Sequence, residues 1–399
     1  MPLVSPSPFT PSTFWWGTAT AAYQIEGGNE NTDWWRFETR EGSFCAEPCA
    51  AACDSWNRWG EDLDLVAGLG LGAYRFSVEW SRVEPERGRV DRGALERYRR
   101  MVEGCRDRGI APVVTLHHFT LPLWVADAGG FEAPGIDGWL SEYAALVADA
   151  LGDELAMACT LNEPNIVAAM GYLAGLFPPG ASDQGRFVAV NETMRRCHEA
   201  MRDALRAGPG DFPVGLTLSM AEYEALEGGE ATLEAYRTEM EDRYLATRGG
   251  DDFLGVQCYT KHLVDANGLV WGGEGELTSM GYLFWPESVG YTLRRAARAG
   301  VPLVVTENGI GTDDDAQRVR YLEGALASLG AARAEGVDVR GYFQWSLLDN
   351  FEWVLGYGPR FGLVQVDRAT FARTPKPSAA WYAERAAAWP AGPGAGLSG

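Results

Sequence analysis

Eight short apolar runs alternate with helix-like stretches along the 399 residues, and this alternation limits the possible folds most strongly. The stretches between the runs, such as 93–109 and 315–336, place apolar residues three and four apart, which is typical of amphipathic helices. Strand–helix alternation predicts a parallel sheet covered by helices. Eight units predict an α/β fold with a (β/α)8 TIM barrel, and a doubly wound open sheet is the alternative. The runs span residues 14–21, 72–80, 110–119, 155–163, 212–220, 252–260, 301–309 and 339–347.

The composition continues unbroken between Phe14 and Tyr382, without a Pro-, Gly- or Ser-rich linker. We therefore expect one barrel domain over residues 1–387. The last residues, which include "WPAGPGAGLSG", predict a flexible tail over 388–399.

Charge and composition exclude several classes of partner. The net charge of −21 argues against nucleic acid and anionic membranes as partners, because both attract positive surfaces. The sequence has no run of 18 apolar residues, which predicts no membrane span. Seven cysteines and an N-terminus without the pattern of a secretory signal favour a cytoplasmic protein with free thiols.

Polar residues gather where the predicted strands end, which is where barrels place their active sites. Glu163 and Glu307 end the fourth and seventh runs, and Arg75 lies near the end of the second. Two carboxylates facing across a pocket are the minimum apparatus for glycoside hydrolysis, provided that one stays protonated and the other ionised. Arg75 is the cation that would hold one glutamate ionised, although each glutamate alone also fits a structural ion pair.

The sequence offers little support for a metal or a cofactor. Cys45, Cys49 and Cys53 fall four residues apart but lack a fourth ligand nearby. The four histidines do not show H-x-x-x-H spacing, and we find neither a P-loop nor a dinucleotide fingerprint. We therefore expect no metal and no cofactor.

Seven sequence blocks, in order along almost the whole chain, resemble those of glycoside hydrolase family 1, the β-glucosidase family. They are "FWWGTATAAYQIEGG", "AYRFSVEWSRVEPERG", "HHFTLPLW", "TLNEPN", "VVTENG", "GYFQWSLLDNFEW" and "GYGPRFGLVQVD". A single block would be weak support, but seven blocks on their expected strands are very specific.

The resemblance implies a retaining mechanism on β-linked sugars, with catalytic roles for four residues. Glu163 would be the general acid/base and Glu307 the nucleophile, Arg75 would support the charge of Glu307, and Tyr259 would hydrogen-bond to it. The carboxyl groups of such a pair lie about 5–5.5 Å apart. The resemblance also implies a set of sugar-binding residues. Asn162 would hold the 2-hydroxyl and Trp345 would form the floor under the sugar ring. The outer hydroxyls would be bound by Gln24, His118, Glu352 and Trp353.

The sequence departs from the family pattern at three places. The sixth-strand block usually reads Asn-Tyr-Tyr but here begins with Gln257, and the third-strand His-Trp pair is completed by Phe119. Asn165 stands where an aromatic residue of the family often faces the leaving group. In addition, the segment 260–280 looks shortened, and this predicts a more open mouth of the barrel. The block after the eighth strand lacks the lysine and serine of members that take 6-phosphosugars.

We therefore predict an exo-acting retaining β-glycosidase, most simply a β-glucosidase, that takes small non-phosphorylated β-glycosides. One alternative is a transglycosidase or specialised-metabolite glycosidase with the same residues. The other is a catalytically inactive sugar-binding barrel.

Overall fold

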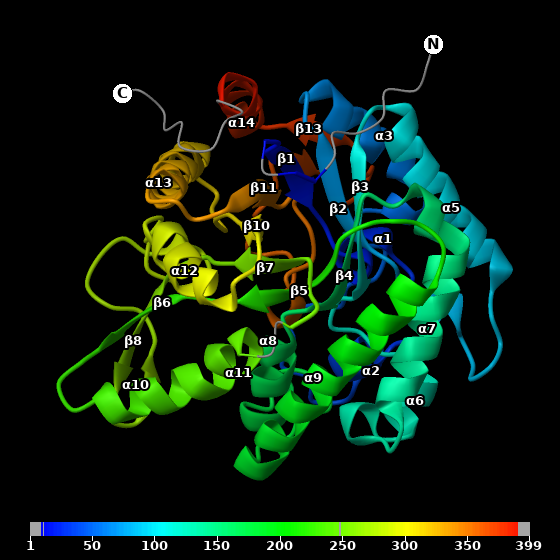
Figure 1. Cartoon of the computed structure of the whole chain (residues 1–399), viewed down its shortest axis with the longest axis horizontal. Helices are drawn as coiled ribbons and strands as arrows, with labels where there is room; N and C mark the ends of the chain where they lie inside the picture. The colour runs from blue at the N-terminus through cyan, green and yellow to red at the C-terminus, as the bar shows by residue number, and fades with distance from the viewer. Residues whose placement is uncertain (1–8, 11, 247–248, 390–399) are drawn as a thin grey trace.

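Eight parallel strands close into a barrel in the computed structural model of the chain, which describes residues 9–10, 12–246 and 249–389 (Figure 1). Around the barrel the order is β1-β2-β3-β4-β5-β7-β10-β11, and β11 pairs back with β1. Each predicted run contains one barrel strand, so the TIM-barrel prediction is confirmed and the open-sheet alternative is wrong. The strands are β1 Trp15–Ala19, β2 Ala73–Ser77, β3 Ala111–His117, β4 Met157–Asn162, β5 Val214–Ser219, β7 Phe253–Gln257, β10 Leu303–Asn308 and β11 Val339–Trp345.

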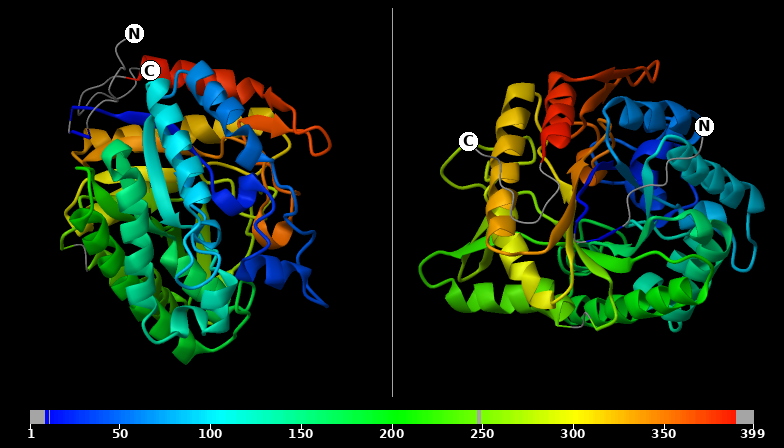
Figure 2. Two further views of the ribbon diagram at one scale, coloured as in Figure 1. Left: turned by 90° about the vertical axis from the view of Figure 1, so that its right-hand side faces the viewer. Right: turned by 45° about the horizontal axis from the view of Figure 1, so that its top comes forward.

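Helices surround the barrel and cover its outer face (Figure 2). Several begin at an aspartate that accepts backbone N–H groups of the first turn, as Asp91 does for α5 and Asp314 for α13. No described helix is long and apolar enough to cross a bilayer. The α-helices are α1 Ala22–Glu26, α2 Asp33–Thr39, α3 Ser55–Gly68, α4 Trp80–Val83, α5 Arg92–Asp107, α6 Leu123–Asp127, α7 Ile136–Leu151, α8 Pro164–Ala168, α9 Gln184–Ala207, α10 Glu230–Arg237, α11 Arg243–Leu245, α12 Ser288–Ala296, α13 Asp315–Ala334 and α14 Pro377–Ala388.

Shorter elements lie in the loops. The 3-10 turns are η1 Gly130–Glu132, η2 Gly152–Glu154, η5 Ala297–Ala299 and η6 Trp353–Leu355, and the π-helical turns are η3 Ala169–Leu173 and η4 Thr238–Asp242. Two small sheets lie outside the barrel. One joins β6 Glu222–Ala225, β8 Lys261–Asp265 and β9 Gly268–Val270, and the other joins β12 Val364–Val366 and β13 Arg373–Pro375.

The C-terminal helix α14 completes the ring next to β1. The Tyr382 hydroxyl donates to the Gly17 carbonyl at 2.8 Å, which ties α14 to the first strand. Trp389 is buried, with its ring 5.4 Å from that of Trp16. The predicted tail boundary therefore falls within the packed end of α14, and residues 390–399 lie outside the described residues.

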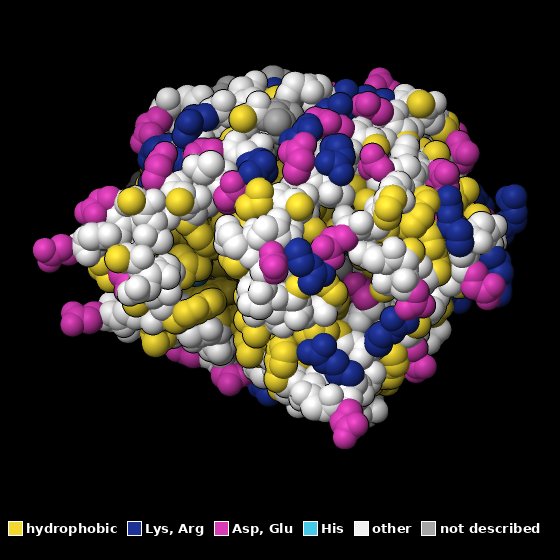
Figure 3. All heavy atoms as spheres, turned by 90° about the horizontal axis from the view of Figure 1, so that it is seen from below, with side chains coloured by type: hydrophobic (Ala, Val, Ile, Leu, Met, Phe, Trp, Pro, Cys, Tyr) yellow, Lys and Arg dark blue, Asp and Glu magenta, His cyan; other side chains and the backbone are white. Residues whose placement is uncertain are grey.

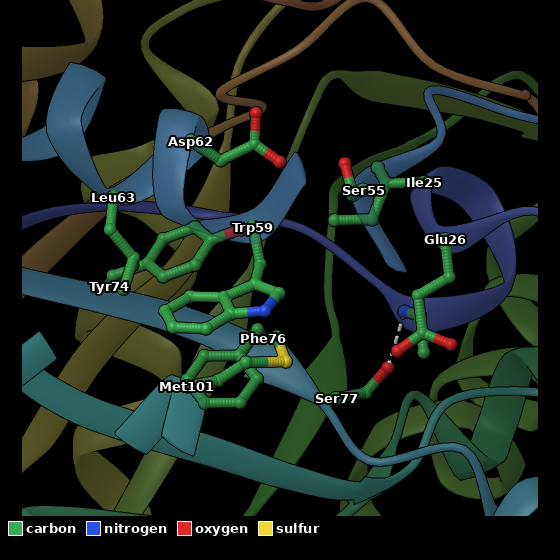
Figure 4. Close-up of a pocket in the computed structure, with 11 residues that line it drawn as sticks. Ile25, Glu26, Ser55, Trp59, Asp62, Leu63, Tyr74, Phe76, Ser77 and Met101 are labelled. Atoms are coloured by element: carbon green, nitrogen blue, oxygen red, sulfur yellow. Dashed lines mark hydrogen bonds between the residues drawn. The ribbon is translucent and has the colours of Figure 1, made fainter. Parts of the chain in front are cut away.

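A small cavity lies on the outside of the barrel, between β2 and the helices α1, α3 and α5 (Figure 4). Aromatic and apolar side chains fill one side of it, and the Ser77 hydroxyl accepts the Ala22 N–H at 2.7 Å on the other. None of the predicted site residues lines this cavity. It belongs to the packing between helices and sheet.

Gly215 of β5 provides a test of the barrel's packing. A Cβ at this position would clash with the Phe253 carbonyl oxygen of the neighbouring strand β7, so we expect Gly215→Ala to lower the free energy of unfolding by about 1–3 kcal/mol. Gly60 lies inside α3 with open space around its Cβ position. Gly60→Ala should therefore stabilise the protein by about 0.5–1 kcal/mol. Urea unfolding of both variants measures the difference, and equal effects would contradict the packing argument.

Candidate active site

A cavity of about 360 Å³ opens at the C-terminal ends of the barrel strands. Nine of the ten predicted site residues line it, and the tenth, Arg75, lies beneath its floor. The structure thus brings together residues that lie up to 329 positions apart in the chain, from Gln24 to Trp353.

Glu307, at the end of β10, is held by three donors. The Arg75 Nη1 and Gln257 Nε2 groups donate to its Oε1 at 2.6 and 2.8 Å, and the Tyr259 hydroxyl donates to its Oε2 at 2.5 Å. Burial raises the pKa of Glu307, while Arg75 and the Tyr259 hydroxyl lower it. The carboxylate in turn raises the pKa of Arg75 against the effect of burial. The pKa of Glu307 is raised on balance, but its three donors oppose the effect of burial and favour the ionised form.

Glu163 lies in a different environment at the end of β4. Its backbone is left-handed, with φ 44°, and it directly precedes Pro164, the first residue of α8. Burial raises the pKa of Glu163 well above its usual value, and the charge of Glu307 raises it further. No described arginine or lysine forms an ion pair with it. Of the two carboxyl groups, Glu163 therefore has the environment that more strongly favours the protonated form.

The side-chain amide of Asn162 is oriented by its neighbours. Its Oδ1 accepts from Arg75 Nη2 at 2.5 Å, from Gln257 Nε2 at 2.8 Å and from the Thr217 hydroxyl at 3.1 Å. The Nδ2 group consequently faces His118 Nε2, at 3.2 Å, and the cavity. Asn162 thus presents a donor to any group bound there.

Gln257 was not among the predicted site residues, although it contacts both Glu307 and Asn162. The sequence does mark this position, because Gln257 replaces the asparagine that the family pattern has at the end of the sixth predicted strand. Reversing its amide would place an oxygen against the Glu307 carboxylate and the Asn162 carbonyl oxygen. The two acceptors therefore determine its orientation.

Three predicted sugar-binding residues carry buried polar atoms without a protein partner, namely Gln24 Oε1, His118 Nδ1 and Glu352 Oε2. Burial and the nearby Arg75 charge lower the pKa of His118, so its ring is neutral. Because its Nε2 accepts from Asn162, its Nδ1 carries the hydrogen. Burial and the charge of Glu307 raise the pKa of Glu352 to about 8. Unpartnered groups of this kind are costly unless a ligand satisfies them.

Aromatic rings form the rest of the inner wall. The Trp345 ring lies 5.8 Å from the His118 ring and nearly parallel to it, and Trp353 lies 4.9 Å from Phe119. Phe119 and Trp353 both have left-handed backbones, with φ 74° and 51°. Strained residues of this kind cluster at functional sites, where the surrounding structure holds them in place.

The departures from the family pattern have different structural consequences. Phe119 lines the cavity, but Asn165 is completely buried and donates to the carbonyls of Ser219 and Met240. The expectation that Asn165 affects the leaving-group side is therefore corrected, because its side chain ties α8 to its neighbours. The segment 260–280 forms β8 and β9 and contributes residues to the cavity wall instead of leaving that side open.

Two carboxyl groups in contrasting environments at the mouth of a barrel define a glycosidase site. The family model described as "Glycosyl hydrolase family 1" matches residues 7–247 and 272–388. The chain therefore belongs to glycosyl hydrolase family 1 and is a glycoside hydrolase.

Similar proteins support this assignment over nearly the whole chain. Beta-glucosidase A of Thermotoga maritima is 34% identical, covering 93% of this chain and 96% of that protein. A bifunctional beta-D-glucosidase/beta-D-fucosidase of Bifidobacterium breve is also 34% identical, over 93% and 97%. The crystal structure of beta-glycosidase BGL167 has a TM-score of 0.89 and 39% identity, covering 95% and 97%.

Tyr259→Phe tests how the hydroxyl affects Glu307. Loss of this donor should raise the pKa of Glu307, so the acid limb of the pH profile of kcat/KM should move to higher pH. We also expect kcat/KM to fall by about 100-fold. Tyr291→Phe removes a hydroxyl outside the cavity and serves as the matched control. An unchanged acid limb in Tyr259→Phe would contradict this assignment.

Proposed function

We propose that the protein is an exo-acting retaining β-glycosidase that removes a terminal, non-phosphorylated hexose, foremost glucose, from small β-glycosides. The contrast between Glu307 and Glu163 carries this proposal. Glu307 has three donors, whereas Glu163 is buried without a cation, which are the environments required of a nucleophile and a proton donor.

The reaction proceeds in two displacements. Glu307 attacks the anomeric carbon while Glu163 protonates the departing oxygen, which yields a covalent glycosyl-enzyme and a free alcohol. Glu163, now ionised, takes a proton from water, and that water attacks the anomeric carbon and releases the sugar with its configuration retained. The Asn162 Nδ2 group is positioned to donate to the 2-hydroxyl, a contact that strengthens toward the transition state.

The inner end of the cavity suits a single sugar. The unpartnered atoms of Gln24, His118 and Glu352 supply acceptors and a donor for hydroxyl groups, and the Trp345 ring suits an apolar sugar face. None of the cavity-lining residues is a lysine or an arginine, which disfavours a phosphorylated sugar. The β-glucosidase and β-fucosidase names of the relatives fit the same class of substrate.

We also infer the domain organisation and the cellular compartment of the protein. We assign the catalytic unit to one domain over residues 1–387. All seven cysteines are free, and six of them are buried, which supports a reducing compartment such as the cytoplasm.

Glu163→Gln tests the role of the acid. A nitrophenyl leaving group needs little protonation, whereas an alkyl alcohol needs a proton as the bond breaks. We therefore expect kcat/KM to fall at least about 100-fold more for an alkyl β-glucoside than for 4-nitrophenyl β-glucoside. Equal losses on the two substrates would argue against proton donation by Glu163.

Glu307→Gln separates catalysis from binding. Wild-type enzyme should hydrolyse members of a nitrophenyl glycoside panel, and the variant should lose about 10⁴-fold or more of that activity. Product analysis by NMR should find free β-configured sugar as the first product. Glycosylated acceptor in excess of free sugar would point to a transglycosidase, and equal inactivity of wild type and variant would favour the binding protein.

A further inference from the structure

The outer part of the cavity differs in chemistry from its inner end. Gln24 and His118 are buried at the inner end and Glu352 is half-buried there, whereas Leu176, Leu355 and Trp271 are 37%, 41% and 63% exposed and mark the mouth. Hydrophobic side chains gather around a hollow on the side of the molecule that carries β6, β8 and α10 (Figure 3). We call the apolar lining of the mouth the outer wall, and it comprises Met170, Leu176, Met240, Leu269, Trp271 and Tyr282.

The outer wall borders the proton donor. Glu163 directly precedes α8, and Ile166, Ala169 and Met170 of α8 and η3 line the same cavity. Because Glu163 protonates the departing oxygen in the proposed reaction, the leaving group must lie next to this segment. The outer wall is therefore the surface that the leaving group contacts.

Three aromatic rings, from His262 of β8 and from Trp271 and Tyr282 after β9, form a group at the mouth. The Trp271 and Tyr282 rings are nearly parallel, at 18° with centroids 6.1 Å apart, and the His262 ring meets both at steep angles. The pairing of β8 with β6 and β9 supports this group. Leu269 and Trp271 lie between the two segments that the family model matches, residues 7–247 and 272–388.

The outer wall offers few partners for hydroxyl groups. A second sugar carries several hydroxyls that would lose water against the methionine and leucine side chains of the outer wall without gaining hydrogen bonds. An apolar ring loses no hydrogen bonds there and gains contact with the aromatic group. Burial lowers the pKa of His262 to about 4, so its ring adds no charge to the wall at neutral pH.

We propose that the outer wall, with Trp271 as its main contact, selects β-glycosides whose leaving group is an apolar aromatic alcohol over disaccharides. This inference rests on the proposed β-glycosidase function. Trp271 is a specificity-determining residue that touches the aglycone and has no part in the chemical step.

Three substrates separate leaving-group binding from chemistry. 2-Phenylethyl β-D-glucoside and cellobiose both release an alkyl alcohol of similar reactivity, but only the former carries an aromatic ring. β-D-Glucosyl fluoride releases fluoride and makes no contact with the outer wall. Wild-type kcat/KM should be at least about tenfold higher for the phenylethyl glucoside than for cellobiose, which corresponds to about 1.4 kcal/mol.

Trp271→Ala should lower kcat/KM for the phenylethyl glucoside about tenfold while changing the values for cellobiose and glucosyl fluoride less than about threefold. Trp271→Phe should restore most of the preference. Phe44→Ala is the matched control, because Phe44 is a similarly exposed aromatic residue outside the cavity, and it should change nothing.

Two results would overturn the inference: a wild-type kcat/KM for cellobiose equal to or above that for the phenylethyl glucoside, or equal losses on all three substrates in Trp271→Ala. Failure of the wild-type enzyme to hydrolyse glucosyl fluoride would instead reject the proposed function, and the inference with it.

Discussion

The buried ion pair between Arg75 and Glu307 is the interaction on which the rest of the site depends. Arg75 is completely buried inside the barrel, and its three donor nitrogens reach Thr115, Glu307 and Asn162. A buried guanidinium is stable only when its donors are satisfied and its charge is matched. One side chain therefore influences the charge of Glu307, the proposed nucleophile, and the orientation of the Asn162 amide next to it.

The same pair accounts for the contrast between the environments of Glu307 and Glu163. Arg75 lies against Glu307, so the low dielectric of the barrel interior strengthens the attraction there. Glu163 receives the repulsion of that charge without a cation of its own, and its proton is retained. Glu352 lines the same cavity and also has a raised pKa, so three carboxyl groups share the site without all being charged.

The cavity is divided into two chemical environments along its depth. Its inner end has unsatisfied polar atoms that match hydroxyl groups, and its mouth has apolar and aromatic side chains. The segments that follow the strands β1, β3 and β11 provide the polar atoms of the inner end, whereas α8, η3 and the β8–β9 segment provide much of the mouth. In the proposed reaction the polar inner end takes the sugar, and the loops at the mouth, which vary most easily, contact the leaving group.

The sequence by itself determined the barrel, and it predicted nine residues that the structure brings together in one cavity. Strand–helix alternation is a local property, because each run must be apolar to be buried inside a ring of helices. The seven blocks, such as those containing Glu163 and Glu307, then assigned residues to strand ends. Only the tertiary structure decided which way individual side chains point. Asn165 turns away to buried carbonyls and Gln257 joins Glu307 to Asn162, because their partners come from other strands and helices. Trp271 likewise lines the mouth in a segment that the pairing of β8 with β6 holds in place. The sequence spacing of β6 and β8 does not predict that these strands pair.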